Sequence, residues 1–492
     1  MIESARFYQS SWAVQTPDNG LSDVRYCIAC VTRGGLEISP PTSHKTHNYI
    51  DYITTNPTTM SVLRPLTTIN SSSAPYPPPS SVPRRKEPPR RLSINYLNRI
   101  RNAQGWKAGE RVLLDIEKDG YTPNAFHYSA IISKCAKKKQ SGKALELLKR
   151  MITQGVAPSA PVFCAAIDAC AKVGQYKSAI SLLNDMEDTY GVKPTVKCFS
   201  AAITSCEKAA KWEEAVKLLR KMAKKGVKPD VVVYSSVISA CEKCAEWEKA
   251  LEFLAEMEEV GVPPNVVSYN ATISACEKGR QPVSALSLLA QMKEKGTQPN
   301  VVSYSSTISA CEKGGAKYTD AALSMFAEMK KAGINPDDAA YIAITKACFD
   351  SNRYPETLEL VREAADLHLL VNGRSVRINM SMENGQPKWD LHDLSEAMAC
   401  MLLADALLSL VHSSNERMSP KYQDVIVVTG KGLNTEDPNG PVLREKVPVF
   451  LNDIAGLETT VVGGNEGRFL ITAVSVEEWA TSGGSEKFNG LF

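Results

Sequence analysis

No apolar run in the chain is long enough to form a transmembrane helix, which needs about 20 consecutive apolar residues. Cys27-x-x-Cys30 and Cys241-x-x-Cys244 are lone pairs, because neither has a complementary cysteine pair or spaced histidines nearby to complete a zinc site. Residues 52–86 contain no acidic residue. These absences argue against a membrane-spanning protein and against a zinc or redox motif, and they set the amino-terminal region apart.

The amino-terminal region has the composition of a targeting segment followed by a linker. Residues 52–86 are rich in Ser, Thr and Pro and carry four basic residues, as mitochondrial and plastid transit peptides do. Residues 71–91 are rich in Pro and Ser, which indicates a semi-extended linker. We therefore expect residues 1–89 to be disordered and to direct the chain to a chloroplast or a mitochondrion.

Seven cysteines recur every 35 to 37 residues: Cys135, Cys170, Cys206, Cys241, Cys276, Cys311 and Cys348. A period in this range indicates stacked supersecondary units. Because these cysteines occupy the same position in successive units, we expect them to be buried free thiols. Thirteen cysteines without disulfides would suit a reducing compartment.

Each period predicts a helical hairpin. Residues 231–265 contain two segments with apolar residues at helical spacing. The apolar residues are Tyr234, Val237, Ile238 and Cys241 in the first segment and Ala250, Leu251, Leu254 and Met257 in the second. Gly261 fits a C-cap, and Pro263 and Pro264 prevent continuation of the helix. Neither helix can bury its apolar stripe alone, so stacked hairpins should form an α-helical solenoid with a concave groove.

The repeats resemble those of pentatricopeptide repeat proteins. The match is carried by Val-Val-Ser-Tyr-Asn at 266–270, Ile-Ser-Ala-Cys at 273–276, Ala-Leu-x-Leu-Leu at 285–289 and the closing Met292, Gly296 and Pro299-Asn300. Six units are identified, with a degenerate one before them and a terminal one after them, which together span residues 90–370. The units are 125–159, 160–195, 196–230, 231–265, 266–300 and 301–337. The resemblance implies a reader of single-stranded RNA that uses one repeat for each base.

In that family, the fifth and the last residue of a repeat together select the base. The pairs in units three to six are Ser200 with Asp230, Ser235 with Asn265, Asn270 with Asn300, and Ser305 with Asp337. The family code implies G, A, C and G, and hence a core preference for GACG. Units one and two depart from the code with Ser129/Ser159 and Cys164/Thr195. Ser, Asn and Asp are also common loop and cap residues, which is the structural alternative.

The second residue of a unit should provide an apolar wall for the base. Val232, Val267 and Val302 fit this role, whereas Phe126, Pro161, Lys197 and Ala339 occupy the position elsewhere.

A lysine follows each of the first six periodic cysteines by two residues. These ladder lysines are Lys137, Lys172, Lys208, Lys243, Lys278 and Lys313. One cation per repeat could meet one phosphate per nucleotide. The alternative is a solvated helix face on which each lysine pairs with a neighbouring glutamate, such as Glu207, Glu242, Glu277 or Glu312. The net charge is +7 over residues 90–370 and −6 from residue 371 onward, so the repeats carry the positive field.

The chain from residue 371 to 492 follows a different pattern. A strand should end near His392, a helix should cover 394–412, and Val425-Ile426-Val427-Val428 should form a second strand. A helix near 440–452 and strands near 459–463 and 468–474 should follow. This alternation predicts a small α/β sandwich of about 100 residues.

Two short motifs stand out in this region, Trp389-Asp390-Leu391-His392 and Thr429-Gly430-Lys431-Gly432. They make the region similar to small MutS-related (Smr) domains. Asp390 and His392 match the family's Leu-Asp-x-His motif, although Trp389 replaces its leucine. Thr429, Gly430, Lys431 and Gly432 match Thr-Gly-x-Gly in full, although Asn434 stands where the family often has histidine. Pentatricopeptide repeats followed by an Smr domain form a known subfamily.

The resemblance implies two competing functions. Asp390 and His392, two apart on a strand, would share a face and could activate water in phosphodiester cleavage, with a divalent metal as cofactor if one is used. The loop of Thr429–Gly432 would hold the phosphate. In this first case the protein is an organellar endoribonuclease whose repeats select the site. In the second it is a non-catalytic RNA-binding protein that protects a transcript or recruits other factors. A scaffold that binds DNA or protein is a third alternative.

Overall fold

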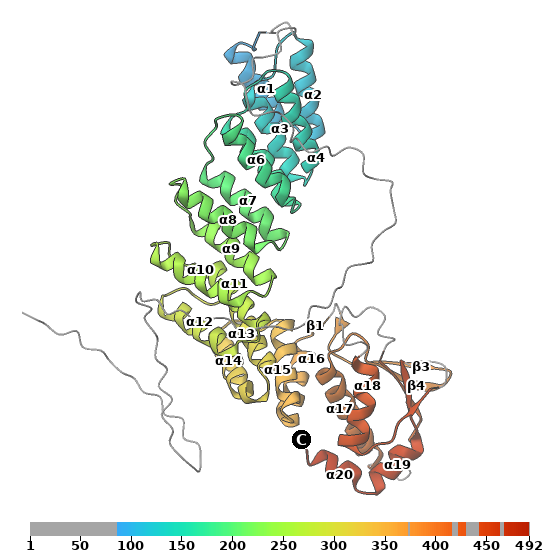
Figure 1. Ribbon diagram of the computed structural model, residues 1–492. Helices are drawn as coiled ribbons and strands as arrows, with labels where there is room; N and C mark the ends of the chain where they lie inside the picture. Colours follow the sequence, from blue (N-terminus) through green and yellow to red (C-terminus); the bar gives the residue numbers. More distant parts are fainter. Residues whose placement is uncertain (1–85, 372–373, 416–421, 430–441, 463–466, 492) are drawn as a thin grey trace, which may run out of the picture. The chain divides into compact units, whose positions relative to one another are not determined.

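The computed structural model describes residues 86–371, 374–415, 422–429, 442–462 and 467–491 (Figure 1). These residues fall within one compact unit, Ser73–Phe492. Within them, no helix combines the length and the apolar character needed to cross a membrane. The predicted targeting segment and the Cys27/Cys30 pair lie outside the described residues.

Helical hairpins follow one another from Arg90 to Asp366. We call the first helix of each hairpin its A helix and the second its B helix. The A helices are α1 (Arg90–Asn102), α3 (Ala125–Lys137), α5 (Ala160–Lys172), α7 (Val196–Lys208), α9 (Val231–Lys243), α11 (Val266–Lys278), α13 (Val301–Lys313) and α15 (Asp338–Asp350). The B helices are α2 (Gly105–Lys118), α4 (Ser141–Thr153), α6 (Tyr176–Asp188), α8 (Trp212–Lys224), α10 (Trp247–Glu259), α12 (Pro282–Glu294), α14 (Thr319–Lys331) and α16 (Tyr354–Asp366). A short 3-10 helix, η1 (Ala316–Tyr318), precedes α14.

The hairpin boundaries that the sequence predicted agree with those of the structure. Each A helix from α3 to α15 begins at the first residue of a predicted unit. Gly261 follows the end of α10 with φ of 76°, a left-handed conformation that favours glycine. Pro263 and Pro264 then lead into α11. The prediction of a helical solenoid is confirmed.

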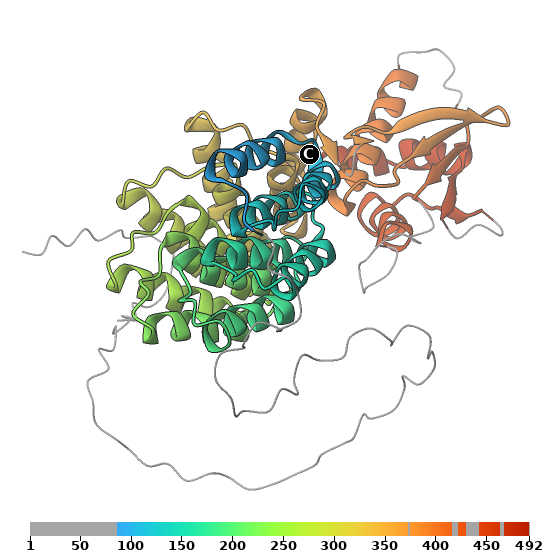
Figure 2. The ribbon, with the colours of Figure 1, turned by 90° about the horizontal axis from the view of Figure 1, so that it is seen from above.

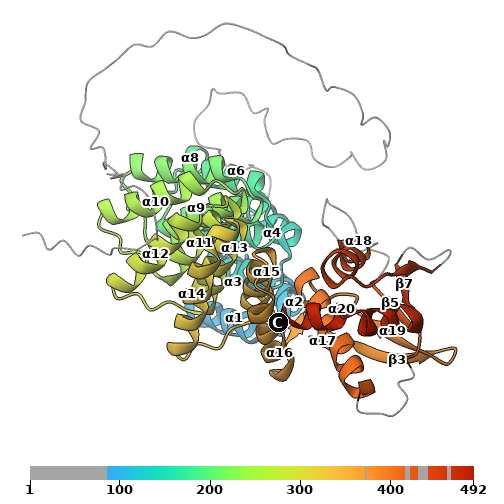
Figure 3. The same ribbon diagram turned by 90° about the horizontal axis from the view of Figure 1, so that it is seen from below.

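The A helices form the inner layer of the solenoid. Each A helix packs against the A helices of the neighbouring repeats, whereas the B helices pack mainly against A helices. In Figure 3, α8, α10, α12 and α14 lie outside α9, α11, α13 and α15. Figure 2 shows the stack from above, from the end that carries α1 and α2. The closer spacing of the A layer places it on the inside of the curve.

The periodic cysteines lie in the core between hairpins. All seven are fully buried and free, as predicted. Burial raises the pKa of the Cys241 and Cys276 thiols to about 12, so they stay protonated and unreactive. The expectation of a chain without disulfides is wrong at two other cysteines. Cys164 and Cys198 form a disulfide between adjacent A helices. An absence of disulfides therefore no longer supports the prediction of a reducing compartment.

Buried tyrosines join the two helices of a hairpin. The Tyr234 hydroxyl donates to Glu256 over 3.1 Å, and the Tyr304 hydroxyl donates to Glu328 over 3.0 Å. Both tyrosines are the fourth residue of an A helix, and both glutamates lie on the following B helix. Each contact satisfies a hydroxyl that would otherwise be buried without a partner.

The carboxyl-terminal region contains a small mixed sheet, as expected of the predicted α/β domain. Its strand order is β3-β4-β5-β7-β6, and a separate pair is formed by β1 and β2. The strands are β1 (Leu370–Val371), β2 (Arg374–Ser375), β3 (Asn379–Glu383), β4 (Gln386–Asp390), β5 (Val425–Val428), β6 (Thr460–Val461) and β7 (Arg468–Ile471). The helices are α17 (Glu396–Asn415), α18 (Val442–Val449), the π-helical turn η2 (Phe450–Ala455), α19 (Ala473–Thr481) and α20 (Gly484–Asn489).

Two predicted strand boundaries in this region are wrong. The last strand ends at Ile471, because the Thr472 hydroxyl accepts a hydrogen bond from the Ser475 N–H and starts α19. The strand expected to reach His392 ends at Asp390, and His392 lies in the turn that follows.

Candidate nucleic-acid interface

The closing residue of each repeat is the N-cap of the next A helix. Asp230, Asn265, Asn300 and Asp337 each accept a hydrogen bond through one side-chain oxygen from the backbone N–H three residues later. The structural alternative therefore holds for all four residues. Capping uses only Oδ1, however, and Asp230, Asn265 and Asn300 remain exposed. One residue can thus cap a helix and present its remaining polar atom to a base.

The fifth residues lie beside these caps but are bonded differently from repeat to repeat. Asn270 donates to Oδ1 of Asn300 over 3.0 Å, and Ser305 donates to Oδ1 of Asp337 over 2.7 Å. Ser235 lies 3.0 Å from the Ser268 hydroxyl and is nearly buried. The described contacts include no hydrogen bond between Ser200 and Asp230 or between Ser235 and Asn265. Two of the four predicted pairs are therefore in direct contact, and in all four the closing residue is the more exposed member.

The third residue of the following A helix is a contact that the sequence interpretation missed. The Ser303 hydroxyl donates to Oδ1 of Asn270 over 2.6 Å, and the Ser268 and Ser235 hydroxyls share a hydrogen bond of 3.0 Å in which either can donate. A hydroxyl therefore fixes the orientation of the reading residue in the repeat before it. The repeated Val-Val-Ser at the start of units five and six is the signal that could have revealed it.

Exposed apolar side chains stand next to the caps. The exposed fractions of Val232, Val267 and Val302 are 53%, 57% and 50%, and that of Phe126 at the equivalent position is 69%. Each is the second residue of an A helix. Exposed apolar side chains therefore recur in the same register on successive repeats. We call the surface made by the second, fifth and closing residues of the repeats the A-helix face.

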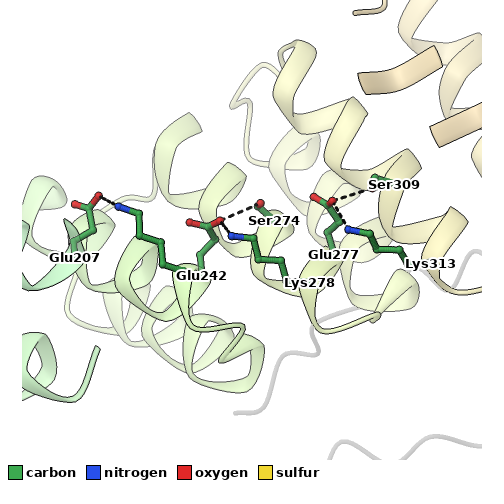
Figure 4. A network of polar contacts seen from close by, with 8 residues as sticks. Glu207, Glu242, Ser274, Glu277, Lys278, Ser309 and Lys313 are labelled. Atoms are coloured by element: carbon green, nitrogen blue, oxygen red, sulfur yellow. Dashed lines mark hydrogen bonds and ion pairs between the residues drawn. The ribbon is translucent and has the colours of Figure 1, made fainter. Parts of the chain in front are cut away.

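The later ladder lysines pair with glutamates of the preceding repeat. Lys243 contacts Glu207 over 2.9 Å, Lys313 contacts Glu277 over 2.8 Å, and Lys278 contacts Glu242 (Figure 4). Ser274 and Ser309 also donate to Glu242 and Glu277. The pairs cross between repeats because residues adjacent in a helix point in different directions. These lysines are partly exposed and partly neutralised.

The earlier ladder lysines have no such cross-repeat partners. Within the described residues, Lys137 and Lys208 form no ion pair, and Lys172 has only a long contact of 3.7 Å with Asp168 of its own helix. Burial, followed by the nearby charges of Lys172 and Lys139, lowers the pKa of Lys208. Burial is the larger cause of the lowered pKa, and Glu207 and Asp168 offset part of the effect of the neighbouring lysines. This cluster is the strongest candidate for phosphate binding in the ladder.

The Asp390 and His392 side chains meet although His392 is not on the strand. Oδ1 of Asp390 bonds both the backbone N–H and Nδ1 of His392, and Asp393 lies 3.4 Å from the other ring nitrogen. β4 and β5 are parallel, with Asp390 opposite Val428, so the turn after β4 and the segment after β5 leave the same edge of the sheet. A carboxylate that orients an imidazole is an arrangement used in general acid–base chemistry.

The rest of the predicted phosphate loop lies outside the described residues. Thr429 is buried and its N–H donates to the Gly467 carbonyl over 3.0 Å, whereas Gly430, Lys431, Gly432 and Asn434 are not described. Among the residues that the structure covers, no three His, Cys, Asp or Glu side chains form a group suited to a metal ion.

Models of pentatricopeptide repeats match the solenoid. The pentatricopeptide repeat domain matches residues 111–172 and 217–279, the PPR repeat family matches 264–313, and the PPR repeat matches 162–188 and 197–227. The solenoid is built from pentatricopeptide repeats. The matched residues end at 313, so the Smr resemblance remains a prediction.

Several solved structures resemble the chain at low identity. The pentatricopeptide repeat protein PPR10 from maize is 19% identical with a TM-score of 0.40, and the match covers 66% of this chain and 48% of that one. The repeat domain of Arabidopsis thaliana protein-only RNase P 1, solved with tRNA, is 21% identical with a TM-score of 0.31, covering 34% and 86%. The chain thus spans about half the length of the maize protein. No curated protein sequence matches the chain.

Proposed function

We propose that the pentatricopeptide repeats bind single-stranded RNA along the A-helix face, one repeat to a nucleotide, in RNA processing within a chloroplast or mitochondrion. The observation that carries the proposal is the exposed valine beside an exposed cap residue in successive repeats. A nucleobase has an apolar face and a polar edge, and both would be met by such a pair. Duplex nucleic acid keeps its base faces stacked and cannot use the valines.

The paired fifth and closing residues also predict which RNA sequence the repeats prefer. By the code that the family resemblance implies, units three to six should prefer G, A, C and G in this order. The cap residue offers a carboxylate in units three and six, where the code gives G, and an amide in units four and five. A carboxylate can only accept hydrogen bonds from a base, whereas an amide can also donate. The bases facing units one and two are left open.

The test compares three ligands in a fluorescence anisotropy titration. These are a short RNA containing GACG, a scrambled RNA of the same composition, and a DNA duplex of the same sequence. We expect the tightest binding to the GACG RNA. Equal affinity for all three ligands would contradict base recognition, and preference for the duplex would favour the scaffold alternative.

A second candidate activity is endonucleolytic cleavage by the carboxyl-terminal region. It is favoured by the direct contact between Asp390 and His392 at the edge where β4 and β5 end. In this proposal Asp390 orients the imidazole, and His392 moves a proton in phosphodiester hydrolysis. The repeats would place the RNA and the Smr-like region would cut it.

Cleavage is tested by single-turnover reactions on end-labelled GACG RNA, with and without added Mg²⁺. The full-length protein should produce a cut at one position. Asp390→Asn and His392→Ala should abolish the cut and leave the RNA affinity unchanged, because neither residue lies on the A-helix face. His412→Ala serves as the matched control, since the hydrogen bond of His412 among the described residues is to the Leu408 carbonyl. Equal products from wild type and both variants would leave the non-catalytic alternative, protection or recruitment, in place.

A further inference from the structure

One base-reading position of the solenoid holds a cysteine that is bonded to another cysteine. Cys164 is the fifth residue of unit two and lies on α5, and Cys198 is the third residue of α7 in unit three. Their Cα atoms are 4.8 Å apart and their sulfur atoms form a disulfide. A Cα separation in this range allows the bond without movement of the backbone. The two stacked helices therefore bring the cysteines together through the same packing that builds the solenoid.

The same two positions make the orienting contact in later repeats. They are occupied by Ser235 and Ser268, whose hydroxyls are 3.0 Å apart, and by Asn270 and Ser303, which are 2.6 Å apart. In unit two the disulfide replaces that hydrogen bond. It therefore acts on the residue that would face the base and not on a remote part of the core.

Cys164 differs from the seven periodic cysteines in access and from Cys244 in partner. The seven periodic cysteines are fully buried, and Cys244, which is partly exposed, bonds the Ala210 carbonyl. Cys164 is partly exposed and lies 3.6 Å from the exposed Thr195 hydroxyl, the closing residue of its own repeat. Cys198 is fully buried behind it. This arrangement provides one thiol that reagents can reach and a second that can complete a disulfide.

We propose that Cys164 and Cys198 form a reversible redox site that changes the RNA contact of the second repeat, an inference that rests on the RNA-binding function proposed above. In the reduced form, the Cys164 thiol and the Thr195 hydroxyl both face the base. In the oxidised form, the Cys164 sulfur has no proton to donate, is held toward Cys198, and ties α5 to α7. The second repeat then offers the base only Thr195.

The chemistry is thiol–disulfide exchange with a small disulfide such as oxidised glutathione. The Cys164 thiolate attacks one sulfur of glutathione disulfide, which breaks that bond and releases one glutathione thiolate. The Cys198 thiolate then attacks the Cys164 sulfur of the mixed disulfide and releases the second glutathione. The two cysteines lose two electrons and two protons, and the two glutathione molecules gain them. Excess reduced glutathione reverses both steps.

The experiment uses the full-length protein equilibrated in buffers of varied reduced-to-oxidised glutathione ratio. Alkylation followed by mass spectrometry measures the free thiols at Cys164 and Cys198. Anisotropy in the same buffers measures affinity for four RNAs that differ only in the base facing unit two. Between the reduced and oxidised states we expect the affinity for at least one of these RNAs to change by about threefold to tenfold, the value of one hydrogen bond. Preference at the GACG positions should not change.

Matched variants separate the redox effect from other causes. Cys198→Val should fold, because valine occupies the equivalent position as Val162 and Val233, and it should keep the reduced behaviour at every glutathione ratio. Cys244→Ser should respond as wild type does. A disulfide that forms without any change in RNA affinity, or thiols that stay reduced throughout, would overturn the inference while RNA binding stands. Absence of RNA binding in both states would overturn the proposed function and the inference with it.

Discussion

At the closing position of a repeat, one side chain serves both the helix and the ligand. Oδ1 of Asn300 accepts bonds from the Ser303 N–H over 3.1 Å and from Asn270 over 3.0 Å, which leaves its NH₂ group for a base. Asparagine and aspartate are equally good N-caps. The repeat can therefore exchange one for the other without loss of the helix start.

Asn300→Asp should change base preference without changing stability. The carboxylate keeps the cap but cannot donate to a base, so the preference for C opposite unit five should be lost while the melting temperature is preserved. Asn300→Ala is the control that removes both functions, and it should cost about 1 kcal/mol of unfolding free energy. Affinities for RNAs varied at one base, together with thermal melts, provide the measurement. An unchanged base preference in Asn300→Asp would restrict this residue to capping.

His127, the third residue of α3, completes the capping box of the N-cap residue Asn124 with a titratable group. It is fully buried, its N–H donates to Asn124, and its ring contacts Asn124 and Ser93. Burial lowers its pKa below the ordinary value of 6.5. The unfolded chain thus binds a proton more readily than the folded chain, so the stabilising contribution is complete above pH 6.5 and is lost as pH falls below it.

His127→Ser should remove this pH dependence from the first repeats. Serine fits the position because Ser268 and Ser303 form the same capping box in α11 and α13. Hydrogen exchange of α1 to α3 should accelerate between pH 7 and pH 5 in wild type, relative to the trend in the variant. Parallel pH trends in the two proteins would show that the histidine does not set acid sensitivity.

At the scale of helices, the cap residues and the regular cysteine spacing are the features that allowed the repeats to be predicted from the sequence. A closing Asn or Asp followed by an apolar pair marks the starts of α3, α9, α11 and α13, so these repeat boundaries follow from local chemistry. The partners of Lys243 and of Cys164 depend on how one helix stacks on the next, and local patterns do not encode that register. The segment after Ile471 continues with β-branched residues typical of a strand, but Thr472 caps it into α19.

The packing between hairpins depends on small residues where an A helix ends. A Cβ atom on Gly279 would lie 2.3 Å from Cδ1 of Trp247, the first residue of α10. Gly279 has an ordinary φ of −78°, so steric contact with the indole is what favours glycine here.

Gly279→Ala should destabilise the solenoid by about 1–3 kcal/mol through overpacking. Gly142→Ala is the matched control, because Gly142 lies in α4 with nothing within 4 Å of its added Cβ. It should stabilise the protein by about 0.5 kcal/mol through helix propensity. Urea denaturation of the three proteins gives the comparison. Equal midpoints for both variants would mean that Trp247 moves aside without cost.

At the scale of the molecule, the ladder lysines divide into two groups. Lys137 and Lys208 are unpaired within the described residues, and Lys243, Lys278 and Lys313 pair with glutamates. A paired lysine has part of its charge already neutralised, so it releases fewer counterions from RNA. The amino-terminal repeats should therefore contribute more of the salt-dependent affinity.

Lys208→Gln should weaken binding to matched and scrambled RNA alike and lower the slope of log affinity against log salt by about 0.7. Glu242→Gln should act in the opposite direction, because it frees Lys278 for phosphate. Glu252→Gln, which removes a glutamate paired with Lys249 on the outer helix α10, should change neither quantity. These slopes come from anisotropy titrations at several salt concentrations. If Lys208→Gln leaves the slope unaltered, the ladder lies outside the RNA path.

The cross-repeat pairing makes repeats four and five interchangeable. Each of them offers a glutamate to the ladder lysine of the next repeat and takes one from the previous repeat (Figure 4). If unit four were excised, Glu207 would meet Lys278 in place of Lys243, and if it were duplicated, every new boundary would regenerate the same pair. Gene recombination within this array could thus lengthen or shorten the protein by whole units, and the length of its binding site would change one nucleotide at a time.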